Sequence, residues 1–151
     1  MKIFKELNQL AITYNNLDFI FPMHPNPNIQ KHKKLLSEIN IIKPLEYSKL
    51  IKLLSEVKFV ISDSGGIQEE CAAFGKKVLV CRDTTERPEG MKAGFAKVIG
   101  TNIINNFEWA NNNPKWKGEN PYGDGNASGK ILKILSDGPL PKDVKKVFYD
   151  L

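Results

Sequence analysis

Apolar and polar residues along this 151-residue chain alternate between helical and strand periodicity. From Ile3 to Tyr14, apolar residues recur every three or four positions, which predicts an amphipathic helix. Short apolar runs then predict strands, and helical patterns separate most of them. The expected strands are 18–22, 40–42, 59–62, 78–81 and 96–99; the later helices are 29–36, 46–56, 67–74 and 127–135, with a loop at 111–125 and a final helical turn at 144–149.

Strands that alternate with helices form parallel βαβ units, because a parallel strand needs a crossover connection. The expected strands show little polar alternation, which is typical of strands that helices cover on both faces. The pattern therefore predicts an α/β fold, a three-layer α/β/α, Rossmann-like parallel sheet, in one domain that spans residues 1–151. The chain opens on a helix, whereas such a domain ordinarily opens on a strand.

Composition narrows the class of protein. With 41% hydrophobic residues and a mean hydropathy of -0.34 the chain can bury a core, and no apolar run approaches the roughly 20 residues of a membrane span. The opening residues lack a signal-peptide core, so we expect a cytoplasmic protein with no membrane partner. The net charge is +5, but the lysines are scattered and the arginines are Arg82 and Arg87; we expect anionic ligands rather than nucleic acid.

Neither the cysteines nor the histidines predict a metal centre. Cys71 and Cys81 lack CxxC spacing and lie in apolar surroundings, which indicates reduced, buried thiols. His24 and His32 have no carboxylate or thiol beside them at ligand spacing. We therefore predict neither a disulfide nor a bound metal ion.

The densest chemical signal lies at 59–70, where a strand ends in a turn with two glycines and a helix begins at once. Glycines allow backbone N–H groups to approach an anion, and a helix N-terminus adds unpaired donors and a positive dipole end. Ser64 can cap the helix or bond a phosphate oxygen, and Glu70 can accept hydrogen bonds from ribose hydroxyls. An ordinary capped helix explains the same residues equally well.

Two further polar loops follow apolar strands. In the loop 81–90, Arg87 can reach a phosphate, oriented by Glu86 or Asp83, although a solvated loop with internal ion pairs is the alternative. After the first strand, His24 can donate to a phosphate, although a histidine beside prolines is more often structural. Open α/β folds bind ligands at the carboxyl ends of their strands, so we expect the three loops to share one site.

These motifs resemble those of non-hydrolysing UDP-N-acetylglucosamine 2-epimerases. In order they are HPNPN (24–28), KPLEY (43–47), DSGGIQEE (63–70), GKKVLVCRDTTERPEG (75–90) and NPYGDG (120–125). The similarity runs from about Phe4 to Leu135, and DSGGIQEE followed by RDTTERPE is its most specific part. The resemblance implies the C-terminal domain of a two-domain GT-B enzyme. Such an enzyme interconverts UDP-GlcNAc and UDP-ManNAc by eliminating and re-adding UDP, with no metal or nicotinamide cofactor.

The resemblance also implies roles for individual residues and an assembly. His24 is the implied catalytic residue, in contact with the phosphates or the sugar, and a homodimer is the implied assembly. Leu50 departs from the aromatic residue that the family leads us to expect there. The implied substrate-binding residues are Ser64, Gly65 and Gly66 for the diphosphate, Glu70 for the ribose, Leu45 for the uracil, and Arg87 for the phosphates or sugar.

A larger departure from the family concerns whole segments. By resemblance, the carboxylates that move the C2 proton belong to an N-terminal domain, and the first strand of the C-terminal domain carries an HRREN-type segment; neither occurs in this sequence. Two interpretations stay open. The chain is either a catalytically incomplete part of an epimerase, completed by the missing half as a separate chain, or a UDP-sugar-binding module without epimerase activity. In both, we expect the isolated chain to be inactive.

Overall fold

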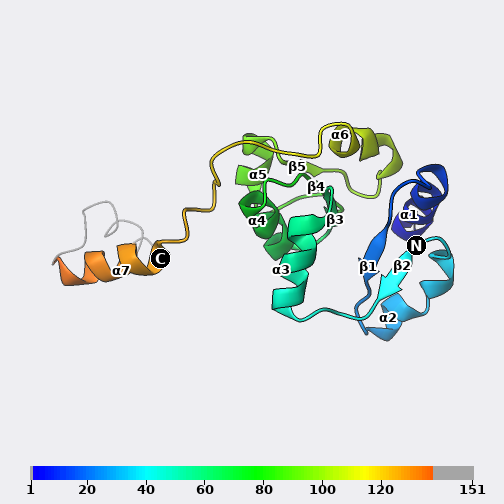
Figure 1. Cartoon of the computed structure of the whole chain (residues 1–151), viewed down its shortest axis with the longest axis horizontal. Coiled ribbons are helices and arrows are strands. Elements are labelled where there is room, and N and C mark those ends of the chain that lie inside the picture. Colours follow the sequence, from blue (N-terminus) through cyan, green and yellow to red (C-terminus); the bar gives the residue numbers. More distant parts are fainter. Residues whose placement is uncertain (1, 138–151) are drawn as a thin grey trace. The chain divides into compact units, whose positions relative to one another are not determined.

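A computed structural model describes residues 2–137 of the chain, and Figure 1 shows its helices and strands. The chain divides into two compact units, Met1–Pro121 and Tyr122–Leu151. The strands that the structure describes all belong to the first unit. The final helical turn expected at 144–149 lies outside the described residues.

Helices and strands alternate along the first unit, as the sequence pattern predicts. The strands are β1 (Ile20–Pro22), β2 (Asn40–Ile42), β3 (Val60–Ser62), β4 (Val78–Val80) and β5 (Ala96–Val98). The helices are α1 (Lys2–Thr13), α2 (Pro27–Gln30), η1 (Lys33–Leu35), α3 (Tyr47–Glu56), α4 (Gly65–Ala73), α5 (Pro88–Ala93), η2 (Ile104–Asn106) and α6 (Phe107–Asn111). Each expected strand is present at its expected place, at most two residues shorter than expected.

The strands form two parallel sheets. β1 pairs with β2, and Phe21 lies opposite Ile41; β4 lies between β3 and β5, with Leu79 opposite Ile61 and Lys97. Helical crossovers join successive strands, which confirms the predicted α/β fold. β1 and β3 do not pair with each other, so within residues 2–137 each has one hydrogen-bonded edge, and Figure 1 shows them on the facing sides of the two sheets.

The core of the first unit lies around β4 and Phe107. All three residues of β4 are inaccessible to solvent. Phe107 begins α6 and is also fully buried, with its ring centroid 4.5 Å from that of Tyr14, 6.0 Å from that of Phe19 and 5.2 Å from that of Phe59. These partners precede β1 and β3, so one phenylalanine packs against segments of both sheets. Burying one such ring stabilises the fold by about 1.5–3 kcal/mol.

Helix α1 is joined to η2, near the end of the same unit in sequence, by hydrogen bonds. Its apolar side buries Leu10 and Ala11. The Glu6 carboxylate accepts hydrogen bonds from the N–H groups of Ile103 at 2.7 Å and Ile104 at 3.1 Å, at the start of η2. Because the N–H groups of a first helical turn have no partner within the helix, this carboxylate satisfies donors that would otherwise stay unpaired.

The prediction of a single helix at 29–36 is wrong, because this part of the chain forms the two short helices α2 and η1. The Asn26 side chain accepts a hydrogen bond from the Asn28 N–H at 2.9 Å, and Pro27 takes the first helical position, so α2 begins early. On one continuous helix, Lys31 and Lys34 would lie one turn apart, where like charges repel.

Helix α5 was not predicted, and its first residues replace the end of the polar loop expected at 81–90. Helix α5 begins at Pro88, in the N1 position that proline favours, and ends before Gly94, whose φ of 85° is left-handed. Both signals are visible in the sequence, but six residues are too few to show helical periodicity. η2 and α6 escaped prediction for the same reason.

The second unit contains α7 (Ala127–Ser136), which confirms the helix expected at 127–135. Its Asp124–Lys130 ion pair, at 3.1 Å, joins the loop before the helix to the second turn. The apolar side chains of Ile131, Leu132 and Leu135 are exposed. Among the helices described between residues 2 and 137, none is long and apolar enough to cross a membrane.

Candidate functional site

The Ser64 turn (residues 63–66) joins β3 to α4, and two serine hydroxyls fix it. The Ser62 hydroxyl accepts a hydrogen bond from the Ser64 N–H at 3.1 Å, and the Ser64 hydroxyl accepts one from the Ile67 N–H at 3.5 Å. Ser64 is therefore the N-cap of α4. Capping uses a lone pair of the hydroxyl and leaves its proton available, so capping and phosphate binding are compatible.

Gly65 and Gly66 form the first turn of α4, where backbone N–H groups have no partner within the helix. A Cβ atom at Gly65 would lie 2.8 Å from Glu86 Oε1, so this glycine lets the turn approach the loop after β4 closely. A Cβ atom at Gly66 would meet only Ser64 Oγ, 3.9 Å away. The close approach explains the first glycine, whereas the second leaves room beside the helix N-terminus.

The Arg87 loop (residues 81–87) follows β4, and one ion pair holds it against α4 while a second lies within the loop. Arg87 Nε donates to the Glu69 carboxylate, and Arg82 Nη1 pairs with Glu86 at 2.7 Å. The pKa of the Glu86 carboxyl lies below its usual value. The largest cause is a hydrogen bond from the backbone N–H of Glu86, followed by the hydrogen bond and charge of Arg82 and the charge of Arg87. We had expected Glu86 or Asp83 to orient Arg87; the carboxylate paired with its Nε is instead Glu69.

Gln68 of α4 is fully buried behind these ion pairs. Its Oε1 accepts a hydrogen bond from the Thr85 hydroxyl at 2.9 Å, and its Nε2 donates to the Ser64 carbonyl at 3.4 Å. Nothing in the sequence marks Gln68 or Thr85 as a residue of the site. A polar contact between two loops leaves no periodicity or fixed spacing in a sequence, so no signal of that kind was available.

Glu70 receives a hydrogen bond from a different helix. The Tyr47 hydroxyl, at the start of α3, donates to Glu70 Oε1 at 2.6 Å. This bond, with a smaller contribution from burial, raises the pKa of Tyr47 above its usual value. Tyr47 is 66% exposed, and Leu45, two residues earlier, is half-buried. The start of α3 therefore contacts Glu70 through Tyr47, two residues after Leu45.

His24 follows β1, in the smaller sheet. Its Nδ1 accepts a hydrogen bond from the Asn26 N–H at 3.2 Å, and its carbonyl accepts one from the Gln30 side chain at 2.9 Å. An accepting Nδ1 in a neutral ring assigns the proton to Nε2, which can then donate to an anion. The side chain is exposed. These contacts are local to the β1 loop, and the meeting of His24 with the Ser64 turn stays a prediction.

Contacts between the described residues thus unite most of the predicted binding residues. The Ser64 turn lies against the Arg87 loop, and a Cβ atom at Gly65 would be 3.9 Å from Arg87 Cζ. Glu70 lies on the helix that this turn begins, and it accepts a hydrogen bond from Tyr47, two residues after Leu45. Their roles in binding a ligand stay predictions.

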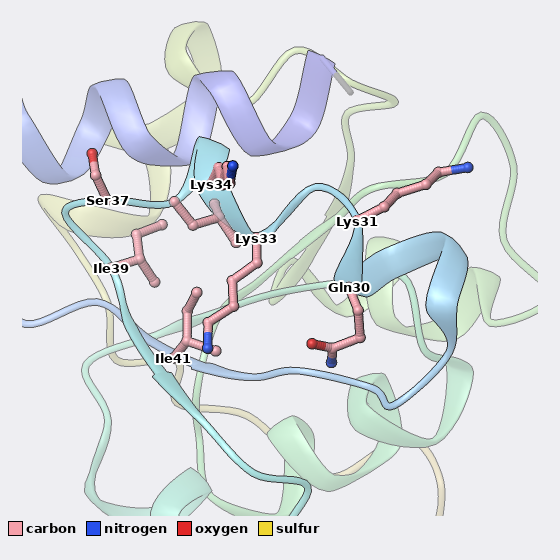
Figure 2. A pocket seen from close by; sticks show the side chains of 8 residues that line it. Gln30, Lys31, Lys33, Lys34, Ser37, Ile39 and Ile41 are labelled. Atoms are coloured by element: carbon pink, nitrogen blue, oxygen red, sulfur yellow. The ribbon is translucent and has the colours of Figure 1, made fainter.

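A shallow cavity of about 760 Å³ lies elsewhere, beside η1 and β2. Figure 2 shows residues that line it, among them Ile39 and Ile41 and the three lysines Lys31, Lys33 and Lys34. The residues that line it include none of the Ser64 turn or the Arg87 loop. We place the candidate site at the Ser64 turn, because backbone donors and an arginine converge there and the cavity opens widely to solvent.

Cys71 is buried, as predicted, whereas Cys81 is only half-buried, because it follows β4 at the start of the Arg87 loop. Burial raises the pKa of Cys71 to about 12 and the pKa of Cys81 to about 11, and the charge of Asp63 contributes to the second. Both thiols are therefore protonated at neutral pH, and a protonated thiol is a poor nucleophile. The chemistry of the candidate site does not draw on them.

The fold and the polar edge of its larger sheet define a Rossmann-like α/β/α domain of the GT-B type, and two solved structures share it. UDP-GlcNAc 2-epimerase from Neisseria meningitidis, bound to UDP-GlcNAc, matches with a TM-score of 0.75 and 40% identity, over 91% of this chain and 41% of that one. A co-structure of Staphylococcus aureus MnaA with UDP gives a TM-score of 0.83 and 37% identity, over 90% and 40% of the two chains.

The chain belongs to the UDP-N-acetylglucosamine 2-epimerase family, whose model matches residues 1–136. The UDP-N-acetylglucosamine 2-epimerase of Campylobacter jejuni is 43% identical in an alignment of 150 positions, which covers 91% of this chain and 39% of that protein. The Neisseria meningitidis enzyme is 44% identical in an alignment of 139 positions, which covers 84% of this chain and 37% of that protein. The resemblance predicted from the motifs is confirmed, and the chain spans less than half the length of these relatives.

Proposed function

We propose that this chain forms the UDP-binding part of a UDP-N-acetylglucosamine 2-epimerase, which interconverts UDP-GlcNAc and UDP-ManNAc for surface polysaccharide synthesis. The observation that carries the proposal is the Ser64 turn, a capped helix N-terminus with two glycines that lies against Arg87. Helix N-termini and guanidinium groups both favour phosphate oxygens. Relatives whose structures hold UDP-GlcNAc or UDP support the same ligand here.

In this proposal each polar group has a separate task. The Ser64 turn holds the diphosphate, and Arg87 adds positive charge from the second loop. Glu70 accepts hydrogen bonds from the ribose, while the Tyr47 hydroxyl orients its carboxylate. The uracil lies against the loop around Leu45. The reaction calls for no metal ion or nicotinamide cofactor.

The proposed reaction is an elimination followed by re-addition. A base removes the C2 proton, the C–H electron pair forms a C1=C2 double bond, and the C1–O electron pair leaves with UDP. Negative charge grows on the diphosphate, where the N–H donors of the Ser64 turn, Arg87 and the Nε2–H of His24 stabilise it. Re-addition of UDP to C1, with protonation of C2 on its opposite face, gives the epimer.

We also propose that a polypeptide segment outside these 151 residues completes both the sheet and the site. One strand between the open edges of β1 and β3 gives the order 3-2-1-4-5-6 of a doubly wound sheet, in which β2 and β5 are the outer strands. By resemblance, the carboxylates that move the C2 proton also come from outside this chain. The proposed partner is thus the missing N-terminal half, in a homodimeric cytoplasmic enzyme, and the isolated chain is inactive.

A UDP-sugar-binding module without epimerase activity is the second candidate. The observation that favours it is the chemistry of the assembled groups, since the Ser64 turn, Arg87 and Glu70 are suited to binding UDP rather than to taking a proton from C2. Both candidates require UDP binding, and they differ in whether activity returns when the N-terminal half is supplied.

Titration calorimetry with UDP tests the shared requirement. Ser64→Ala and Arg87→Ala are each expected to weaken UDP binding about tenfold, the effect of losing one charge-assisted or neutral phosphate contact. Lys92→Ala, which removes an exposed positive charge on α5, is the matched control and is expected to bind like the unmodified chain. Lack of binding at millimolar UDP contradicts the proposal.

An epimerisation assay separates the two candidates. The chain is mixed with the N-terminal domain of the Campylobacter jejuni relative, expressed separately, and conversion of UDP-GlcNAc is followed. Conversion by the mixture, with none by either part alone, is expected for an epimerase completed by a partner. UDP binding without conversion in the mixture indicates the binding module.

A further inference from the structure

Gln68 is a buried polar side chain whose hydrogen bonds join the two loops of the candidate site. It lies in α4, one turn after Ser64, and is fully inaccessible to solvent. A buried amide is costly unless its donor and acceptor are both satisfied. Here the Nε2 donates to the Ser64 carbonyl, and the Oε1 accepts from the Thr85 hydroxyl. The side chain therefore contacts the Ser64 turn at one end and the Arg87 loop at the other.

The chemistry of the partners fixes the direction of each hydrogen bond. The Ser64 carbonyl can only accept, so the amide NH2 must face it and the amide oxygen must face Thr85. The Thr85 oxygen already accepts a hydrogen bond from the Arg87 N–H at 3.1 Å, so its own proton is available for Gln68. An ordered chain of hydrogen bonds thus runs from the Arg87 N–H through Thr85 and Gln68 to the Ser64 carbonyl.

Arg87 is consequently attached to α4 at two points. Its guanidinium pairs with Glu69, and its backbone is held through Thr85 by Gln68. The N-terminus of the same helix presents the Ser64 turn. One rigid element therefore sets the separation between the backbone donors and the arginine.

We propose that Gln68 and Thr85 are positioning residues that hold Arg87 and the Ser64 turn at the spacing of a diphosphate, and so set the affinity for UDP. This inference rests on the proposed function of the site. Neither side chain contacts the ligand; both act through Arg87 and Ser64. Preset donors gain affinity because the ligand does not have to order them when it binds.

Substitutions at Thr85 test the network without emptying the buried amide position. Thr85→Val keeps the shape of the side chain and removes the hydroxyl, and it is expected to weaken UDP binding about tenfold in calorimetry. Thr85→Ser restores the hydroxyl and is expected to bind within about twofold of the unmodified chain. Thr84→Ala, at the exposed neighbouring threonine, is the matched control and is expected to leave binding unchanged.

A double-mutant cycle distinguishes positioning from a general loss of structure. If Thr85 acts through Arg87, Thr85→Val adds less than about twofold to the loss of affinity already caused by Arg87→Ala. A purely structural effect gives the same tenfold loss in both backgrounds. That result overturns the proposal, and so does a Thr85→Val variant that binds UDP as tightly as Thr85→Ser.

Hydrogen exchange of backbone amides, followed by NMR, supplies a readout that needs no ligand. Thr85→Val is expected to speed exchange of the Arg87 N–H, which loses its acceptor, whereas Thr85→Ser is not. Unchanged exchange in Thr85→Val contradicts the network itself. If the unmodified chain does not bind UDP, the proposed function fails and the link to affinity fails with it, while the exchange data still decide whether the network fixes the loop.

Discussion

The two sheets of the first unit differ in how fully their strands are paired and buried. β4 is paired on both edges and buried, and the loop after it is held against α4 by the Arg87–Glu69 ion pair and by the hydrogen bond between Thr85 and Gln68. β1 is paired on one edge, Ile20 is 39% exposed, and the hydrogen bonds of His24 are with residues near it in sequence. We infer that the Ser64 side of the site is preorganised by these residues, whereas the His24 side depends on what pairs with β1.

The largest expected effect concerns the residue that both regions share. Phe107→Ala is expected to lower the free energy of unfolding by about 3–5 kcal/mol, because its buried ring packs against Phe19 before β1 and Phe59 before β3. Urea unfolding followed by fluorescence measures the change. Ile104→Ala, at a position 41% exposed, is the control and is expected to cost about 0.5 kcal/mol or less. A loss for Phe107→Ala below about 1 kcal/mol would show that the two regions do not share this core.

A second substitution tests only the region of the larger sheet, at the end of α4. Gly75 follows α4 with a φ of 60°, and a Cβ atom there would lie 2.8 Å from the Trp116 carbonyl oxygen. Gly75→Ala is expected to cost about 3 kcal/mol, from left-handed strain and a clash with backbone. Gly94→Ala shares the strain, with a φ of 85°, but meets no atom within 4 Å, so about 1–2 kcal/mol is expected. Equal losses in thermal unfolding would mean that Trp116 moves freely.

UDP binding sharpens the comparison between the two sides of the site. In the isolated chain, Arg87→Ala is expected to weaken UDP binding about tenfold, and His24→Ala less than about twofold, because only the first residue is held in place. When the N-terminal half is supplied, the effect of His24→Ala is expected to grow toward that of Arg87→Ala. Calorimetry on both preparations measures this. Equal effects in the isolated chain would contradict the inferred difference.

The smallest expected effect involves the two thiols and is confined to alkaline pH. Burial raises the pKa of Cys71 to about 12 and the pKa of Cys81 to about 11, from an ordinary value of 9.0. The unfolded chain therefore loses thiol protons at lower pH than the folded chain does, so their contribution to stability is complete below pH 9 and is lost as the pH rises toward 11 and 12. Between pH 9 and 10, Cys71→Ala combined with Cys81→Ala is expected to flatten the fall in unfolding free energy. An unchanged slope contradicts this assignment.

Much of the fold could be predicted because its signals are local. Each strand is a short apolar run, and Ser64 and Gly75 stand at the two ends of α4 where capping rules put them. The prediction was wrong at 29–36, where an asparagine cap and a proline start a short helix early. It missed α5, whose six residues are too few for a periodic pattern.

The candidate site could be predicted less completely. The turn at Ser64 and the nearness of Arg87 follow from their places after neighbouring parallel strands. The partners that hold them do not, since Glu69, Gln68 and Thr85 are ordinary polar residues until the chain brings them together. Long-range pairs of this kind leave no spacing in one sequence. The contact of His24 with a ligand stays a prediction, because its hydrogen bonds in the structure are with Asn26 and Gln30 of the following segment.

Gly65 and Glu86 lie so close together that a substitution at one position affects which residues fit at the other. The place that a side chain at 65 would take is occupied by Oε1 of Glu86, whose other carboxylate oxygen, Oε2, pairs with Arg82. A side chain at position 65, with Glu86 unchanged, displaces the Glu86 carboxylate and breaks its ion pair with Arg82. Anyone who redesigns this turn, or reads substitutions across relatives, should therefore expect positions 65 and 86 to vary together.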